Sequence, residues 1–252
     1  MKIITYNVNG VRSAISKGLA EWAKATNADI ICLQEIKASL DVDLSMFHDL
    51  GYKTWLFPAE KKGYSGTAIF SKVAPNHVEV GSGMEAYDRE GRIIRADFNS
   101  FSVMCVYMPS GSSGEDRQAF KFKWMDDFLP YALEVKKKHP NLIICGDYNI
   151  CHKAIDIHNP KSNAKTSGFL PEEREWVQKF LDNGFVDVFR HLYPEKVQYT
   201  WWTYRLNART RGIGWRLDYF LVSEALVPRV KDVIIHDNVM GSDHCPVELV
   251  LD

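Results

Sequence analysis

Hydrophobic residues in this chain gather in short runs, and most runs are bounded by glycine, proline, asparagine, aspartate or serine. Runs of this length with such boundaries predict β-strands. The strongest run, LIIC at 142–145, is uninterrupted until Gly146 ends it, which is typical of a strand buried on both faces. Asn99 and Ser100 separate two runs and predict a hairpin. The segments expected to form strands are 2–9, 29–34, 51–57, 67–71, 92–98, 101–107, 142–145, 217–222, 230–235 and 247–251.

Three other segments carry helical signals. Between residues 115 and 139 apolar side chains recur three or four positions apart, which predicts a helix that Pro130 kinks or splits. Pro171 begins a second helix, which Gly184 ends. A third helical stretch follows the first strand and runs to about residue 25. Strands dominate and no linker interrupts them, so we expect a single α/β domain spanning 1–252, with two sheets packed face to face and helices outside.

Polar side chains follow several of these strands at the point where each strand ends. In the stretch NLIICGDYN, Asp147 and Asn149 leave the backbone on the same side, because side chains alternate along an extended chain. Asn7 and Asn9 repeat this pattern after the first strand. For any one stretch the alternative is an ordinary Asp/Asn-rich turn, but the recurrence favours one shared site. The strand-end polar groups are Asn7, Asn9, Glu35, Tyr107, Asp147, Asn149, Asp218, Asp243 and His244.

If these side chains meet at one rim of the sheets, they carry too many carboxylates to be stable without a cation. Oxygen ligands of this kind favour Mg²⁺ or Mn²⁺, and a single histidine makes zinc less suitable. A divalent ion, a carboxylate base, amides and a histidine together suit hydrolysis of a phosphate ester. Taken alone, His244 would more often be a plain turn residue, so its catalytic interpretation depends on the other rim residues.

A second unusual stretch, WWTYRLNARTRGIGWR at 201–216, interleaves arginines with aromatic residues and contains no acid. This mixture suits phosphate contact combined with stacking on a base or sugar. The alternative is a loop whose tryptophans belong to the core. The arginines are Arg205, Arg209, Arg211 and Arg216, and the large aromatics are Trp201, Trp202, Tyr204 and Trp215.

Composition excludes some classes of protein but does not identify the function. The chain has 252 residues, 46% of them hydrophobic, and a formal net charge of −1, so any basic surface must be local. Its five cysteines show no CxxC spacing, and Cys32, Cys105 and Cys145 lie inside apolar runs. That usage fits a reducing compartment better than disulfides or zinc. With no signal-peptide pattern and no apolar run of membrane-spanning length, a cytoplasmic protein is expected.

Six motifs, in matching order along the whole chain, resemble those of the exonuclease III family of abasic-site DNA endonucleases, within the endonuclease/exonuclease/phosphatase superfamily. The motifs are NVNG at 7–10, LQEIK at 33–37, GDYN at 146–149, NPKSNAKTSGFLPEER at 159–174, WWTYRLNARTRGIGWRLDYFLVS at 201–223 and GSDHCP at 241–246. The short motifs occur across the superfamily and imply metal-dependent phosphoester cleavage. The two long motifs point to its DNA-repair branch. The implied fold is a four-layer αββα sandwich of two mainly antiparallel sheets.

The resemblance also implies the metal ligands. Glu35 would bind the ion, and Asn9 stands where some members of the family carry Asp. Asp147 would either activate the attacking water or bind the metal, and the sequence leaves these alternatives open. The implied ligand set is Glu35, Asn9, Asp243, Asp147 and Asn149.

The implied catalytic groups surround the same ion. Asp218 would fix the tautomer of His244 and favour its charged form, which then donates to phosphate oxygens. Tyr107 would donate to the phosphate or to the developing oxyanion, while two asparagines orient the water and the phosphate. The implied catalytic set is Asp147, His244, Asp218, Tyr107, Asn149 and Asn7.

The long motifs imply contacts with DNA. Trp201, Trp215 and Leu217 match the family's pocket for a flipped-out sugar without a base, which costs little to extrude because its stacking is already lost. Ser110 stands where other members carry an amide. The remaining implied DNA-binding residues are Arg205, Arg209 and Asn163.

The resemblance thus implies a Mg²⁺-dependent DNA repair nuclease, with Mn²⁺ as a substitute, that cuts 5′ to abasic sites and also acts as a 3′-to-5′ exonuclease that trims 3′ ends. Its partner would be double-stranded DNA carrying abasic sites or 3′ ends, with no membrane, and the chain would act as a monomer. One alternative is a phosphatase or phosphodiesterase acting on a non-DNA phosphoester, although the arginines and tryptophans at 201–216 do not suit a lipid substrate. Another is a binding protein that has lost catalysis, although every catalytic position holds a competent residue.

Overall fold

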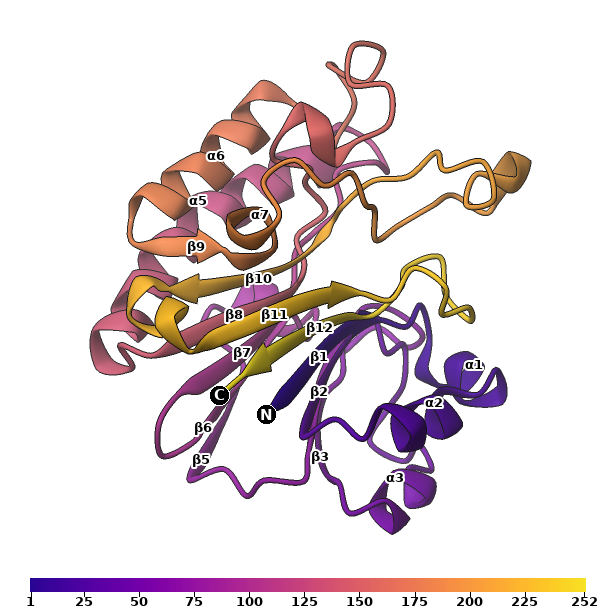
Figure 1. Ribbon diagram of the computed structural model, residues 1–252, viewed down its shortest axis with the longest axis vertical. Helices are drawn as coiled ribbons and strands as arrows, with labels where there is room; N and C mark the ends of the chain where they lie inside the picture. Colours follow the sequence, from indigo (N-terminus) through magenta and orange to yellow (C-terminus); the bar gives the residue numbers. More distant parts are fainter.

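A computed structural model describes all residues, 1–252, and shows two six-stranded sheets packed face to face (Figure 1). The first sheet has the strand order β11-β12-β1-β2-β4-β3, and only its central pair, β1 and β2, is parallel. Its strands are β1 (Lys2–Asn7), β2 (Ile30–Gln34), β3 (Lys53–Phe57), β4 (Thr67–Ser71), β11 (Val230–Ile235) and β12 (Val247–Leu251).

The second sheet repeats this plan with the order β5-β6-β7-β8-β10-β9, and again only the central pair, β7 and β8, is parallel. Its strands are β5 (His77–Val80), β6 (Ile93–Asp97), β7 (Ser102–Tyr107), β8 (Leu142–Asp147), β9 (Phe185–Asp187) and β10 (Asp218–Ser223). The strands β1 and β2 pack against β8. Asn7 at the end of β1 is hydrogen-bonded both to Glu35, which follows β2, and to Asp147 at the end of β8, so the carboxyl ends of these central strands reach one rim. The expectation of two mainly antiparallel sheets packed face to face is confirmed.

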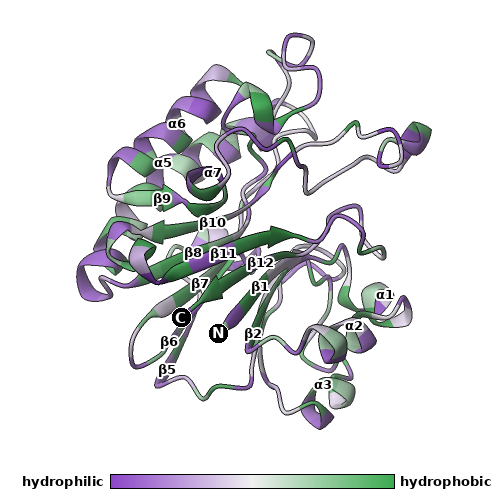
Figure 2. Ribbon diagram, in the orientation of Figure 1, coloured by the Kyte–Doolittle hydropathy of each residue, from purple (hydrophilic) through white to green (hydrophobic).

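Helices cover the outer face of each sheet, which explains why strands such as β2, β4 and β8 are buried on both faces. Figure 2 shows hydrophobic residues concentrated in the strands and hydrophilic residues on the outer helices. The first sheet is covered by α1 (Val11–Ser16), α2 (Leu19–Thr26) and α3 (Ser45–Asp49), and the second by α5 (Glu115–Lys138) and α6 (Pro171–Asp182). The remaining helical segments are α4 (Glu85–Asp88), α7 (Val188–Leu192), η1 (Ala154–Asp156), η2 (Arg205–Asn207) and η3 (Glu224–Arg229). None of the helices combines the length and apolar character needed to cross a membrane.

Gly146 does not end the buried strand, contrary to the sequence-based expectation. It pairs with Val106 of the parallel neighbour, and β8 continues to Asp147. A Cβ at position 146 would lie 1.8 Å from the carbonyl oxygen of Val106, and φ there is +148°. Only glycine fits this close approach, so Gly146 is what allows the strand to carry Asp147 to the rim.

Two helix predictions need correction. Pro130 does not split α5, which is continuous from Glu115 to Lys138. The carbonyl that loses its N–H partner belongs to Asp126, an exposed residue, so water can satisfy it. The stretch that follows β1 is two helices rather than one, because Gly18 has a left-handed backbone conformation between α1 and α2.

Candidate active site

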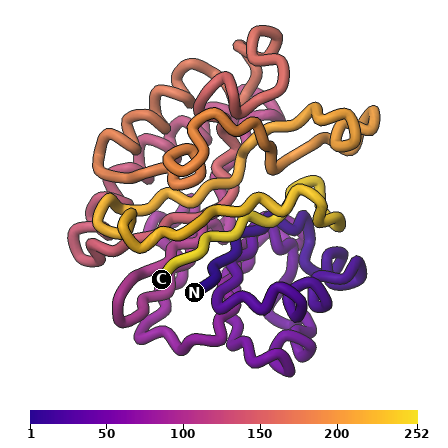
Figure 3. Tube along the Cα trace, viewed as in Figure 1, coloured from indigo at the N-terminus to yellow at the C-terminus, as the bar shows by residue number.

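A cavity of about 320 Å³ opens at the rim where the central strands end. The segment between α7 and β10 and the turn between β11 and β12 extend beside it, in orange and yellow on the right of the chain trace (Figure 3). Ten of the residues predicted for the site line this cavity: Glu35, Tyr107, Ser110, Asp147, Asn149, Trp201, Trp215, Leu217, Asp243 and His244.

Asn7, at the end of β1, connects the two sheets beneath the cavity. Its buried amide nitrogen donates to Glu35 Oε2 at 3.0 Å and to Asp147 Oδ2 at 2.9 Å. Glu35 follows β2 in the first sheet, whereas Asp147 ends β8 in the second. One amide therefore fixes the distance between the carboxylates that the two sheets contribute.

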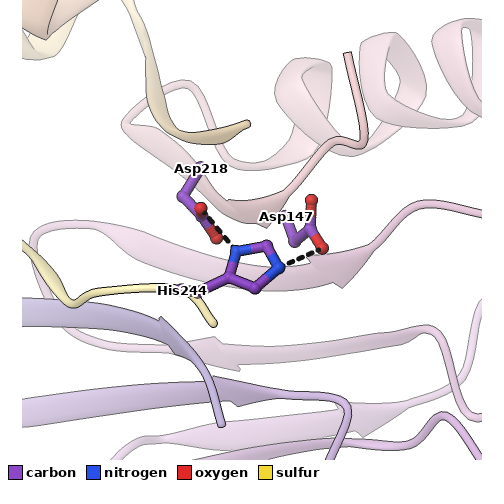
Figure 4. Close-up of side chains that lie close together, drawn as sticks. All are labelled: Asp147, Asp218 and His244. Atoms are coloured by element: carbon purple, nitrogen blue, oxygen red, sulfur yellow. Dashed lines mark hydrogen bonds and ion pairs between the residues drawn. The ribbon is translucent and has the colours of Figure 1, made fainter. Parts of the chain in front are cut away.

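A buried histidine lies between two aspartates (Figure 4). His244 Nδ1 is 2.8 Å from Asp218 Oδ2, and Nε2 is 3.6 Å from Asp147 Oδ2. Burial would lower the pKa of His244, but the charges of Asp218 and Asp147 outweigh it and raise this pKa to about 10. Burial raises the pKa of Asp147 to about 7, against the opposing charge of His244. At neutral pH the site thus presents an imidazolium donor beside a carboxyl group poised to exchange a proton.

Asn149 is held by contacts that the sequence did not reveal. Its N–H donates to Asp147 Oδ1 at 2.8 Å, and its carbonyl accepts from Lys121 Nζ at 2.8 Å. Lys121 is fully buried and pairs with Glu173, which also accepts from the N–H of Gly168 in the cavity wall at 2.6 Å. In the sequence, the one indication of this contact is that Lys121 falls on the apolar face of the helix predicted at 115–139. This buried ion pair connects the segment that carries Asn149 to the segment that carries Gly168.

Tyr107 ends β7 directly opposite Asp147. Burial, and then the charges of Glu35 and Asp147, raise the pKa of Tyr107 well above its ordinary value, so the hydroxyl keeps its proton. Arg92 holds the residue in place: Nη1 donates to the Tyr107 carbonyl at 2.7 Å, and the guanidinium lies 4.9 Å from the ring centroid. The tyrosine can therefore act as a hydrogen-bond donor but not as a base.

Beside the Asp147–His244–Asp218 group, oxygen atoms of Glu35 and Asn9 lie close to the ammonium group of Lys37. Lys37 Nζ lies 2.9 Å from Glu35 Oε1 and 2.6 Å from Asn9 Oδ1. Asn9 in turn donates to Asp243 Oδ1 at 3.0 Å. Carboxylate and amide oxygens that already surround one positive charge fit a hard divalent ion. A second group, Asp147, Asp218 and His244, is also compact enough for a metal, but both nitrogens of the histidine already face carboxylates.

The cavity has one aromatic wall and one hydroxyl wall. The rings of Trp201 and Trp215 meet edge to face at 5.9 Å, and Trp201 Nε1 donates to Asp243 Oδ2 at 3.0 Å. Gly168 packs so closely that a Cβ there would lie 2.9 Å from the Trp215 ring. The hydroxyl wall comprises Ser110 and three residues that the sequence did not identify: Ser112, Thr166 and Ser167. Indole rings and hydroxyl groups lining the same cavity suit a sugar ring.

Three predicted DNA-binding residues lie outside the cavity. Arg205 is exposed in η2, and Asn163 donates to the carbonyls of His158 and Asn159 within its own loop. The guanidinium of Arg209 donates to carbonyls of the turn that carries Asp243 and stacks over Trp202 at 4.4 Å.

Arg216 was expected to favour phosphate contact, and this interpretation is wrong. Its side chain is buried, with Nε 2.8 Å from Asp156 Oδ1 and two further bonds to Asp187. Arg190 completes this ionic cluster on Asp156 at 2.5 Å. Because two acids from distant segments neutralise it, Arg216 cannot reach DNA. It fixes the backbone between two cavity residues.

Replacing Arg216 by methionine should destabilise the fold by roughly 3–5 kcal/mol, since the buried carboxylate of Asp187 would lose its cation and Asp156 would keep only Arg190. The exposed Arg211→Met in the same block should change the free energy of unfolding by less than about 0.5 kcal/mol. Urea unfolding of both variants measures the two changes in the free energy of unfolding. Equal stability of the two variants would contradict the structural role.

The same cluster makes stability depend on pH. Against the effect of burial, Arg216 and Arg190 lower the pKa of Asp156 to about 2. In the wild type the stabilisation from this carboxylate is therefore present above about pH 4 and declines as pH falls towards 2.

Comparisons with known proteins extend over the whole chain. Residues 4–244 match the family model described as the endonuclease/exonuclease/phosphatase family. A protein of Bacillus subtilis (strain 168) named exodeoxyribonuclease is 47% identical over 253 residues, covering 100% of this chain and 99% of its own. The DNA repair nuclease APEX1 of Danio rerio is 43% identical over 100% of this chain and 82% of its own. The structure of an AP endonuclease from Archaeoglobus fulgidus superposes with a TM-score of 0.92 at 32% identity, covering 100% of this chain and 99% of that one.

Proposed function

This chain belongs to the endonuclease/exonuclease/phosphatase family, and on that premise we propose that it cleaves the phosphodiester 5′ to abasic sites in duplex DNA. It is a hydrolytic nuclease, and its family is metal-dependent. The observation that carries the finer proposal is that Asp147 and His244, with Asp218 buried behind the histidine, line the same cavity as two tryptophans. Phosphate chemistry and recognition of a base-free sugar can both take place there.

In the proposed mechanism Asp147 takes a proton from the attacking water, because its raised pKa matches a general base at neutral pH. Asn149 and Asn7 donate to its two oxygens and so hold the carboxyl group in a fixed orientation. His244 as imidazolium and the Tyr107 hydroxyl donate to the phosphate oxygens as negative charge develops.

Glu35 would hold the metal ion, with Asn9 and Asp243 beside it. We propose Mg²⁺, with Mn²⁺ as a substitute, because the donors are hard oxygen atoms. When bound, the ion would neutralise charge on the phosphate. Removing it with a chelator should abolish turnover.

The aromatic wall would recognise the substrate. Trp201, Trp215 and Leu217 leave room for a sugar without a base, whose extrusion costs little because no stacking is lost. The same chemistry on a terminal nucleotide would give 3′-to-5′ exonuclease and 3′-end trimming. We further propose that the chain acts on double-stranded DNA as a monomer and as a single catalytic domain.

The test is a nicking assay on duplex DNA with one abasic site, run with Mg²⁺ and with chelator, beside an inositol phosphate and sphingomyelin. We expect a single nick on the abasic strand that disappears with chelator. Cleavage of the inositol or lipid substrate without DNA cleavage would identify a phosphatase or phosphodiesterase instead. Tight DNA binding without turnover would identify a protein that has lost catalysis.

Trp215→Ala should lower abasic-site cleavage by about tenfold more than it lowers exonuclease action on undamaged 3′ ends. The indole forms the wall of the sugar slot, whereas both activities use the same catalytic groups, so the exonuclease rate serves as an internal control. The ratio of the two kcat/KM values measures the effect. An equal loss of both activities would contradict the proposal that Trp215 lines the pocket for the base-free sugar.

A further inference from the structure

Lys37 lies beside Glu35, the carboxylate proposed to bind the metal ion. Its side chain is 33% exposed, yet the ammonium bridges Glu35 Oε1 and Asn9 Oδ1 instead of extending into water. The backbone on which it stands is fixed, because the N–H groups of Ile36 and Lys37 donate to the carbonyls of Gly66 and Ser65. Lys37 can therefore leave these oxygens by rotation of its side chain, without a change in this backbone.

The segment that carries this lysine is held in a strained conformation. Glu35 and Lys37 both have positive φ, at +54° and +49°, and Asn9 across from them has +46°. Left-handed backbone at non-glycine residues persists only where surrounding contacts impose it. Here it directs the carboxylate, the amide oxygen and the ammonium to the same point, so the contact follows from how this segment is folded.

We propose that Lys37 is a built-in counter-cation, which holds the metal-binding oxygens in the metal-free protein and thereby lowers their affinity for the divalent ion. The inference rests on the proposed function, in which Glu35 binds the metal. The ammonium contacts the oxygens that the ion would need, and one of them, on Asn9, is a neutral amide. Glu35 therefore supplies the only full negative charge in direct contact with Lys37, and the lysine largely cancels it.

Two consequences follow from this competition. Without metal, Lys37 relieves the repulsion between Glu35 and the neighbouring acids, of which Asp147 shares Asn7 as a donor. With metal, the lysine must either leave or remain as a like charge close to the ion. In both cases removing its charge should strengthen metal binding and weaken the metal-free fold.

Calorimetric titration of the DNA-free protein with MnCl₂ tests this directly. Lys37→Met should bind Mn²⁺ about tenfold more tightly than the wild type, the effect expected of one unit charge a few ångströms from a divalent ion in a solvated site. Lys37→Arg keeps the charge and should retain weak binding. Lys53→Met, an exposed lysine at the opposite end of the first sheet, is the matched control and should bind like the wild type.

Thermal unfolding gives a second readout. In chelator Lys37→Met should melt below the wild type, and saturating Mn²⁺ should remove or reverse the difference. Glu35→Gln distinguishes a failure of the proposed metal site from a failure of the proposed role of Lys37. Weaker Mn²⁺ binding by this variant supports Glu35 as a ligand. If Glu35→Gln weakens binding but Lys37→Met leaves it unchanged or weaker, the counter-cation role is overturned and the metal site stands. If Glu35→Gln binds Mn²⁺ like the wild type, the proposed metal site itself fails, and the role of Lys37 fails with it.

Discussion

Asp147→Asn is expected to lower abasic-site cleavage by about 10²–10⁴-fold, the usual contribution of a general base. The carboxyl group lies buried between Asn7, Asn149 and His244, and its pKa of about 7 lets it accept a proton from water near neutral pH. An amide of the same shape cannot accept that proton. Single-turnover cleavage of an abasic duplex measures the loss, and DNA affinity is measured in parallel.

The matched control for this variant is Asp126→Asn, which removes a carboxylate from the exposed side of α5 and should cleave at the wild-type rate. Asp147→Asn should still bind DNA, because the walls of the slot are unchanged. Retention of more than about a tenth of wild-type cleavage would exclude Asp147 as the base.

Asp218→Asn is expected to lower activity in a pH-dependent way. Asp218 accepts from His244 and is the main charge that raises the histidine pKa to about 10. Without that charge the pKa should fall towards the ordinary value of about 6.5. The imidazolium would then be lost as the pH rises through about 6.5, so the loss relative to wild type should grow to about 10²–10³-fold at pH 8–9.

Profiles of kcat/KM against pH distinguish this role from a structural one. His244→Gln removes the titrating group and should lose activity by a similar factor at every pH. If Asp218→Asn also loses activity equally at pH 6 and pH 9, then Asp218 only supports the fold and does not hold the charge of His244.

Most of the fold could be predicted because helices cover both sheets. The strands of β2, β4 and β8 are buried on both faces and therefore appear in the sequence as continuous apolar runs. By contrast β5, with the sequence HVEV, is a largely exposed edge strand, and β9 has only three residues. Neither presents the apolar run on which the strand prediction depended.

The polar ends of the central strands were also visible in the sequence, since a parallel pair must end at one rim. By contrast, the sequence did not show whether a charged side chain points into the core or towards solvent. Arg216 looked like a surface cation, but it turns inward because Asp156 and Asp187, which are far away in the sequence, neutralise it. Lys121 is likewise buried only because Glu173 of another helix pairs with it. Such partners become apparent only once the chain is folded.

An anomalous-difference map from crystals of the Asp147→Asn variant, grown with an abasic-site duplex and Mn²⁺, would locate the ion and the phosphate together. We expect a manganese peak about 2.0–2.3 Å from a Glu35 carboxylate oxygen. The phosphate should lie against His244, with the base-free sugar against Trp201 and Trp215. A manganese peak on Asp218 and His244 instead, with no ion at Glu35, would contradict the proposed site.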